Sequence, residues 1–299
     1  MNNFVSELQS YFASKYPFLS ANIPRQQQLL GDSWSQEFDG ELIKHFGTIE
    51  ELRTAADGYA KFAMDSLLLT AKFQKTKDYD NKTYAECASE VYQSESYMHS
   101  LYLPGILLSH YLWKHHYAMY QFYKSIVVPV LPKSGLFIDV GVGTGFYSRN
   151  LLRDSQMTGI GCDMSPHSLS YTRSTLSKFG TVDKYSFCLC DYYHFNQYFQ
   201  STADFILSIE VLEHLEDPMK MLESLYKSLK PGGLGLISAA VNAPNADHIY
   251  LYRSCEDVRH QLIKAGFEIR HDTCDEAYEA RTIGEVVPVN YGALVCKPS

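Results

Sequence analysis

Runs of positive charge and long apolar segments are absent from this sequence. Its 26 Lys and Arg residues are outnumbered by 34 Asp and Glu residues, which leaves a formal net charge of −8, and no basic run or patch occurs. Because binding to nucleic acid depends on such positive charge, DNA and structured RNA are poor candidates and a small or uncharged substrate is favoured. The most apolar short run, residues 126–132, is too short and too rich in proline to cross a bilayer.

The chain also has little of the sequence pattern that marks export or metal binding. Its N-terminus lacks the basic start and apolar centre of a signal peptide, so we expect a cytoplasmic protein with no membrane partner. No two of its seven cysteines form Cys-x-x-Cys, and several lie in apolar, strand-like runs. Free cysteine in such runs behaves as a small buried apolar residue, so we predict reduced core thiols and no metal site.

The first part of the chain is predicted to be helical and is rich in aromatic residues. Thr48 and Thr83 each precede a Glu by three residues, as in the capping box that begins a helix. After Pro104-Gly105, the stretch 106–128 is apolar or aromatic on most faces, which predicts one long helix buried on more than one side. We place the domain boundary at 132/133. Residues 1–132 would be a helical lid or cap, with a role as a homodimer contact left open, and residues 133–299 a second domain.

A short loop with three glycines follows the first predicted strand. Residues 135–140 form an apolar run that ends in Asp139-Val140, Gly141, Gly143 and Gly145 alternate after it, and a helix can start at Phe146. Glycine permits positive φ and lets a ligand approach the bare backbone. Alone, the loop fits an NAD-binding fold, a nucleoside-binding methyltransferase or an ordinary strand–helix turn.

Strand-like and helical segments alternate through the rest of the chain. This alternation predicts an α/β fold with a doubly wound, seven-stranded, mostly parallel sheet. Asp139, Asp163, Asp191 and Glu210 each follow or end one of the first four strands. Ligands of such sheets bind at the carboxyl ends of the strands, so these acids are expected to converge on one crevice.

These segments resemble the class I S-adenosylmethionine-dependent methyltransferases of small molecules, over about residues 135–297. The third glycine comes one residue too early for an NAD fingerprint. The segment 209–215, Ile-Glu-Val-Leu-Glu-His-Leu, and the later Leu-Lys-Pro-Gly-Gly at 229–233 are very similar to family segments around the fourth and fifth strands. The resemblance implies S-adenosylmethionine as cofactor, bound by Asp139, Gly141, Gly143, Gly145, Asp163, Met164, Asp191, Tyr192 and Glu210.

The implied reaction is an in-line displacement at the sulfonium methyl, assisted by orientation and in some enzymes by a base. His248, in the polar loop after the fifth strand, is the first candidate for this base, and His214 is the second. In an alternative interpretation the loop is a surface segment in which Asp247 pairs with Arg253. His115 and His116 are adjacent in sequence, so their side chains cannot share one face of a helix. Candidate contacts to the acceptor come from the aromatic cap and this loop: Tyr97, His115, Tyr123, Asn242 and Tyr252.

Three functions stay open at this point. The first is methyl transfer to the O, N or C of a small molecule, of the kind made in secondary metabolism. The second uses the same cofactor but breaks another sulfonium bond, by aminocarboxypropyl transfer or cyclisation, and releases methylthioadenosine. The third is a regulatory subunit that binds the cofactor without turnover.

Overall fold

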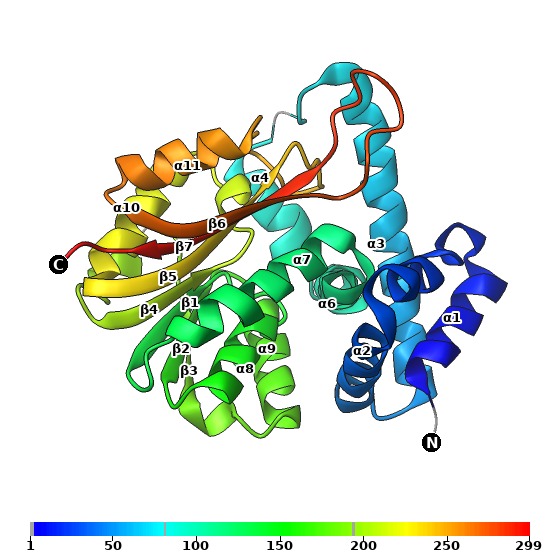
Figure 1. The fold of residues 1–299 in the computed structure, drawn as a ribbon, viewed down its shortest axis with the longest axis horizontal. Coiled ribbons are helices and arrows are strands. Elements are labelled where there is room, and N and C mark those ends of the chain that lie inside the picture. The colour runs from blue at the N-terminus through cyan, green and yellow to red at the C-terminus, as the bar shows by residue number, and fades with distance from the viewer. Residues whose placement is uncertain (1–2, 81, 193–194) are drawn as a thin grey trace.

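The computed structural model describes residues 3–80, 82–192 and 195–299 and contains a seven-stranded sheet with helices on both faces (Figure 1). The strand order is β3-β2-β1-β4-β5-β7-β6, and β7 runs antiparallel to both of its neighbours. The predicted doubly wound, mostly parallel sheet is therefore confirmed. The strands are β1 Leu136–Val140, β2 Thr158–Asp163, β3 Tyr185–Leu189, β4 Ala203–Ser208, β5 Leu229–Val241, β6 Glu268–Glu276 and β7 Val289–Cys296.

Alternate residues of the central strands enter two different cores. Phe137 of β1 belongs to the cluster that includes helix α8 (Phe146–Asp154), whereas the next residue, Ile138, belongs to the cluster beneath α10 (Pro218–Ser228) and α11 (Cys255–Lys264). This is the period of two that a strand buried on both faces requires. Helix α9 (Pro166–Lys178) is capped by Ser165, as the Ser-Pro pair predicts.

The N-terminal helices lie beside the sheet and share a core with it. Long helices α1 (Phe4–Lys15), α2 (Asn22–His45) and α3 (Ile49–Thr76) lie at the far end, and α6 (Leu103–Leu112) and α7 (Lys114–Phe122) lie between them and the sheet (Figure 1). Short turns complete this region and the loops: η1 Pro17–Leu19, α4 Tyr84–Cys87, η2 Ala88–Tyr92, α5 Glu95–Tyr97, η3 Met98–Tyr102, η4 Tyr123–Val127, η5 Val128–Val130, η6 Val182–Lys184, η7 Phe195–Gln197 and η8 Leu212–His214.

One apolar cluster runs from α1 to β7 and joins the cap to the sheet. At Gly292 of β7, an added Cβ would collide with the sulfur of Met119 on α7, so glycine permits this close approach. Farther out, the segment between β6 and β7 reaches α3, where the Gln74 amide donates to Val286 O (2.5 Å) and accepts from Val286 N (3.1 Å). The proposed boundary at 132/133 and the homodimer contact stay predictions.

The single helix predicted for 106–128 is wrong, because the chain breaks at Trp113. Its φ and ψ of −104° and 126° are extended, and α6 ends there and α7 begins. The predicted burial on several faces is confirmed, since all residues of α6 except Ile106 are buried. The capping box at Thr83 is complete, whereas at Thr48 the Glu51 carboxylate accepts instead from Gly47 N.

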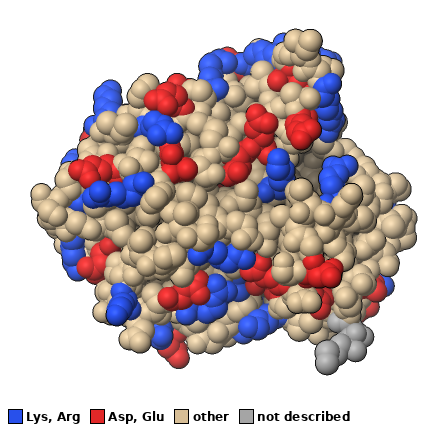
Figure 2. All heavy atoms as spheres, viewed as in Figure 1, with Lys and Arg blue, Asp and Glu red and all other residues tan. Residues whose placement is uncertain are grey.

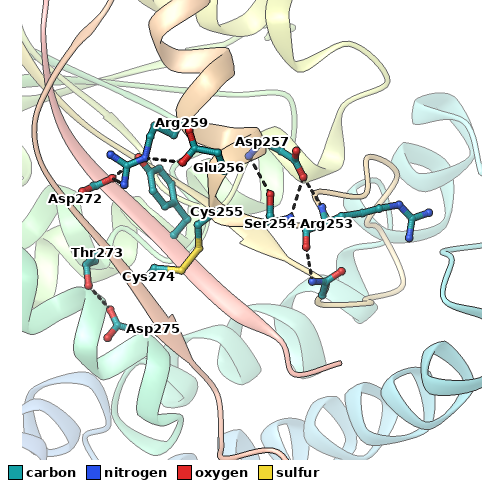
Figure 3. The surroundings of a disulfide bond; sticks show 12 residues. Arg253, Ser254, Cys255, Glu256, Asp257, Arg259, Asp272, Thr273, Cys274 and Asp275 are labelled. Carbon is teal, nitrogen blue, oxygen red and sulfur yellow. Dashed lines mark hydrogen bonds and ion pairs between the residues drawn. A yellow bond between two sulfur atoms is a disulfide. The ribbon is translucent and has the colours of Figure 1, made fainter. Parts of the chain in front are cut away.

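The prediction that all seven cysteines are reduced is also wrong. Cys255 at the start of α11 and Cys274 in β6 form a disulfide (Figure 3), and they are separated by 19 positions in sequence. The turn between α11 and β6 brings the two together, and cysteine spacing alone does not reveal this. The thiol argument for a reducing compartment therefore no longer holds.

The surface carries both signs of charge. Lys and Arg are interspersed with Asp and Glu over the face shown in Figure 2. Within the described residues, the model contains no helix with the length and apolar character that crossing a membrane requires.

Candidate active site

The glycine loop joins β1 to α8 and leaves its backbone open. Gly141, Gly143 and Gly145 all have positive φ, at 83°, 50° and 74°. A Cβ on Gly141 would strike Val211, and one on Gly145 would press against Thr172, so both positions need glycine for space as well as conformation. Gly141 and Gly143 line a large cavity, whereas Gly145 serves as the N-cap of α8.

Two acids at neighbouring strand ends are buried beside this loop. Asp139 is 3% exposed; burial raises its pKa to about 7, although the Ser148 hydroxyl donates to it at 2.6 Å. Asp163 is equally buried, and burial raises its pKa to about 6 despite hydrogen bonds from the backbone of Ser165 and Gly143. In both carboxyl groups the cost of burying the charge outweighs the hydrogen bonds that stabilise it.

Both acids line a cavity of about 1190 Å³ that extends from the glycine loop to the cap. Tyr192 and Glu210 line the same space. The expected convergence of strand ends on one crevice is therefore present for Asp139, Asp163 and Glu210. Glu210 adopts positive φ (52°), and its carboxylate lies 3.7 Å from Nε2 of His116.

A buried polar cluster forms another wall of the cavity. The Asp247 carboxylate is fully buried and accepts hydrogen bonds from the hydroxyls of Tyr92 (2.9 Å) and Tyr102 (2.5 Å). It also lies 3.3 Å from Nδ1 of His214. The alternative that Asp247 pairs with Arg253 is wrong, because the Arg253 guanidinium donates to Lys77 O (3.0 Å) and lies 3.9 Å from Asp78.

The electrostatics of this cluster distinguish its two histidines. Burial opposes charge on His214, but Asp247 and neighbouring acids outweigh it and raise the His214 pKa above its ordinary value. Burial, together with His214, lowers the pKa of His248 to about 3. His248 Nδ1 lies 2.5 Å from Ala243 O, so this nitrogen carries the hydrogen and Nε2 keeps its lone pair.

Glu213 lies behind the two histidines. It is fully buried, neither carboxylate oxygen has a hydrogen-bond partner, and burial raises its pKa to about 8. Glu213, His214 and His248 each place one ligand atom within 4.8 Å of the others. Two imidazoles and a carboxylate form a donor set suited to a divalent cation.

Several other residues that sequence reasoning named are not among those that line this cavity. Tyr123 is buried in the core and donates to Asp154, and Tyr252 is buried and donates to Gln261. The Asn242 amide donates to Arg253 O. Met164, Asp191 and Tyr97 are half-buried and are not among the lining residues, whereas His115 is.

His115 and His116, expected on different faces of one helix, have ring centroids 4.5 Å apart, and both line the cavity. Both residues lie at the beginning of α7, directly after the break in the helix at Trp113. Sequence reasoning did not single out Tyr92, Tyr102 or Glu213. Tyr92 and Tyr102 owe their positions to the packing of η2 and η3 against the loop after β5, which no local pattern indicates, whereas Glu213 lies in η8 and accepts at its backbone oxygen from Ile249 N and Tyr250 N of that loop.

A family model described as "Methyltransferase domain" matches residues 133–279. The chain is 27% identical over 181 residues to the ubiquinone biosynthesis O-methyltransferase of Cereibacter sphaeroides, which covers 60% of this chain and 70% of that protein. It is 33% identical over 110 residues to the protein of the same name from Vibrio cholerae, covering 35% of this chain but only 43% of that relative's length.

Solved structures agree on the fold. Phosphoethanolamine N-methyltransferase 2 of Haemonchus contortus, solved with S-adenosyl-L-methionine, superposes with a TM-score of 0.56 at 13% identity, covering 74% of this chain and 61% of that one. The [4+2]-cyclase SpnF superposes with a TM-score of 0.50 at 16% identity, covering 61% and 80%. A cyclase and a methyltransferase thus share this fold, so the reaction has to be argued from the site.

Proposed function

The chain belongs to the class I S-adenosylmethionine-dependent methyltransferases, and we propose that it methylates a hydroxyl of a small acceptor with an apolar portion. The observation that carries this proposal is the shared cavity: Gly141 and Gly143 of the glycine loop line the same space as His214, which lies against the buried Asp247. A methyl donor at the loop and a hydroxyl at the pair would therefore be close together.

The cofactor half of the cavity would be held by residues at the strand ends. Asp163 suits the two ribose hydroxyls, because a carboxylate can accept two hydrogen bonds from a diol. The bare backbone of Gly141 and Gly143 leaves room for the methionyl part. Asp139, Tyr192 and Glu210 complete this half. Bound S-adenosylmethionine supplies a methyl group that its sulfonium makes electrophilic.

His214 is the proposed general base. Asp247 fixes its Nδ1 side, so Nε2 is left to take the proton of the acceptor hydroxyl as the oxygen attacks the methyl carbon. Bound S-adenosylmethionine would give up its methyl carbon to the acceptor oxygen and keep the electron pair of the methyl–sulfur bond, so S-adenosylhomocysteine would remain. His248, with a pKa near 3, is too weak a base for this step, and we assign it a neutral role in orienting the acceptor.

The unpartnered carboxylate of Glu213 favours a second mechanism at the same place. Glu213, His214 and His248 could hold a divalent cation that lowers the pKa of a bound hydroxyl. Neutral His248 is suited to this role, because a protonated imidazole cannot be a ligand. In this case deprotonation would depend on the ion rather than on His214 alone.

The cap half of the cavity suggests the apolar character of the acceptor. Its wall includes Phe18, Leu29 and Leu67, three side chains that are themselves partly exposed. The relatives' names also refer to O-methylation in ubiquinone biosynthesis. A phenol or catechol with an alkyl or prenyl tail would place its hydroxyl near His214 and its tail in this half.

The test is to incubate the protein with S-adenosylmethionine and a panel of tailed catechols and to identify both products by mass spectrometry. S-Adenosylhomocysteine together with a methylated hydroxyl supports the proposal, whereas methylthioadenosine would support cleavage of another bond. His214→Asn should lower kcat by about 10²–10⁴-fold. His260→Asn, on the exposed face of α11, is the matched control.

The same assay distinguishes the two mechanisms. Treatment with a chelator, followed by removal of the chelator, should abolish activity if the Glu213 cluster holds a required ion, and Mg²⁺ or Zn²⁺ should restore it. Activity that survives this treatment supports the His214 base acting alone. Glu213→Gln should then leave turnover nearly unchanged, because no ion depends on that carboxylate.

A further inference from the structure

Three of the five free cysteines come together on one face of the sheet. Cys162 of β2 and Cys188 of β3 are register partners in adjacent parallel strands, so their side chains lie on the same face. Cys190 follows two residues later on that face. The three sulfur atoms lie within 4.8 Å of one another. Neither the glycine loop nor the Asp247–His214 pair uses these thiols.

The spacing of these sulfurs is close to what a metal ion requires. At a metal–sulfur distance of about 2.3 Å, three thiolates around one ion stand about 4 Å apart. The cluster therefore needs only small side-chain movements to surround an ion. Strand pairing fixes the Cα positions of Cys162 and Cys188, and a backbone hydrogen bond from Cys190 N to Asp163 O holds the third, so the site is largely formed before an ion binds.

Burial of the cluster is graded from one side to the other. Cys162 is fully buried, whereas Cys188 and Cys190 are half-buried on or beside β3, which forms the edge of the sheet. An ion would approach from this edge and leave one coordination position open to water or to an external thiol. Thiolate ligands select soft cations such as Zn²⁺ and Cu⁺ over Mg²⁺ and Ca²⁺.

We propose that Cys162, Cys188 and Cys190 form a three-thiolate site for one soft metal ion, separate from the methyl-transfer centre. The site is connected to the cofactor crevice through the backbone. Cys162 O accepts from Gly141 N (2.9 Å), and Cys190 N donates to Asp163 O (3.0 Å). A bound ion would thus fix the two strand ends that carry the glycine loop and the proposed ribose-binding acid.

The test is an anaerobic titration of the ion-free protein with Cd²⁺, in the absence of reductant so that the Cys255–Cys274 disulfide stays intact. A thiolate-to-cadmium charge-transfer band that saturates at about one ion per chain is expected. The band should be lost in Cys188→Ser and kept in Cys87→Ser, which changes a buried free cysteine outside the cluster.

Two results would overturn the inference: no band in the wild-type protein, or a band of equal strength in Cys188→Ser. If Cys188→Ser does not fold, Cys190→Ser, at the other half-buried position, gives the same comparison. Zn²⁺ should compete for the site and weaken the cadmium band of the wild-type protein. These readouts need neither cofactor nor acceptor, so they do not depend on methyl transfer.

Discussion

At the scale of single residues, Asp163 gives the proposed cofactor crevice a testable pH response. Its carboxyl group is buried, which raises its pKa to about 6. Ribose hydroxyls would donate to the ionised form, so binding should lower this pKa and release a proton. The affinity for S-adenosylmethionine should consequently rise as the pH increases through about 6.

Isothermal titration at several pH values, in buffers of different ionisation enthalpy, measures both the affinity and the proton release. Asp163→Asn should bind more weakly and lose the change in affinity centred near pH 6, which leaves only the contribution of Asp139, whose pKa burial raises to about 7. An affinity that falls with rising pH in the wild-type protein would contradict the role given to Asp163.

A second prediction at this scale concerns the pair Asp247–His214. Asp247 raises the pKa of His214, and a base must be deprotonated to act, so kcat/KM should fall below the raised pKa. Asp247→Asn removes the negative charge that stabilises the imidazolium. It should therefore lower the His214 pKa and move the acid limb of the profile to lower pH.

In Asp247→Asn, the amide oxygen of the new side chain could still accept from Tyr92 or Tyr102, so the fold of the cluster should persist. Full pH profiles of kcat/KM for both proteins provide the measurement. An acid limb that stays in place or moves to higher pH would exclude His214 as the titrating base.

At the scale of secondary-structure elements, two contacts hold α11 on the edge strand β6. One is the Cys255–Cys274 disulfide, and the other is the ion pair of Arg259 with Asp272 (Figure 3). A cross-link that closes a loop of this length stabilises a protein by about 3 kcal/mol in the chain-entropy model. The double variant Cys255→Ser/Cys274→Ser should lose roughly this free energy of unfolding.

Urea unfolding of this variant and of the wild-type protein, both without reductant, gives the difference. Cys296→Ser, a free cysteine in the neighbouring strand, is the control. Because Arg259 and Asp272 still join the two elements, the variant should stay folded and bind the cofactor. An unchanged free energy of unfolding would mean that the Cys255–Cys274 disulfide does not stabilise the protein.

Local sequence signals locate some secondary-structure elements and not others. The first strand and the start of α8 lie within one residue of their expected positions, because an apolar run and the glycine loop mark them locally. The lengths of β5 and β6 depend on long-range pairing instead: Leu229 at the start of β5 pairs with Ala203 of β4, and β6 pairs with β7 from Glu268 to Glu276. The break at Trp113 has no local signal, since no proline or glycine marks it.

At the scale of the whole molecule, the glycine loop and the buried acids are predictable because a parallel sheet gathers its strand ends at one edge. The polar wall of the cavity cannot be predicted in this way. Tyr92, Tyr102 and Asp247 are separated by up to 155 positions and meet only because the cap packs over the loop after β5. Long-range packing of this kind leaves no periodic trace in a sequence.

The hydrogen bonds between Gln74 and Val286 have a kinetic consequence. Residues of α3 and of the segment between β6 and β7 line the cavity mouth, and this pair holds them together. A methylated product with an apolar tail would leave only after these bonds part, so turnover should slow as solvent viscosity increases. In Gln74→Ala, kcat should become less sensitive to viscosity, and KM should increase; stopped-flow and steady-state rates in sucrose solutions measure both.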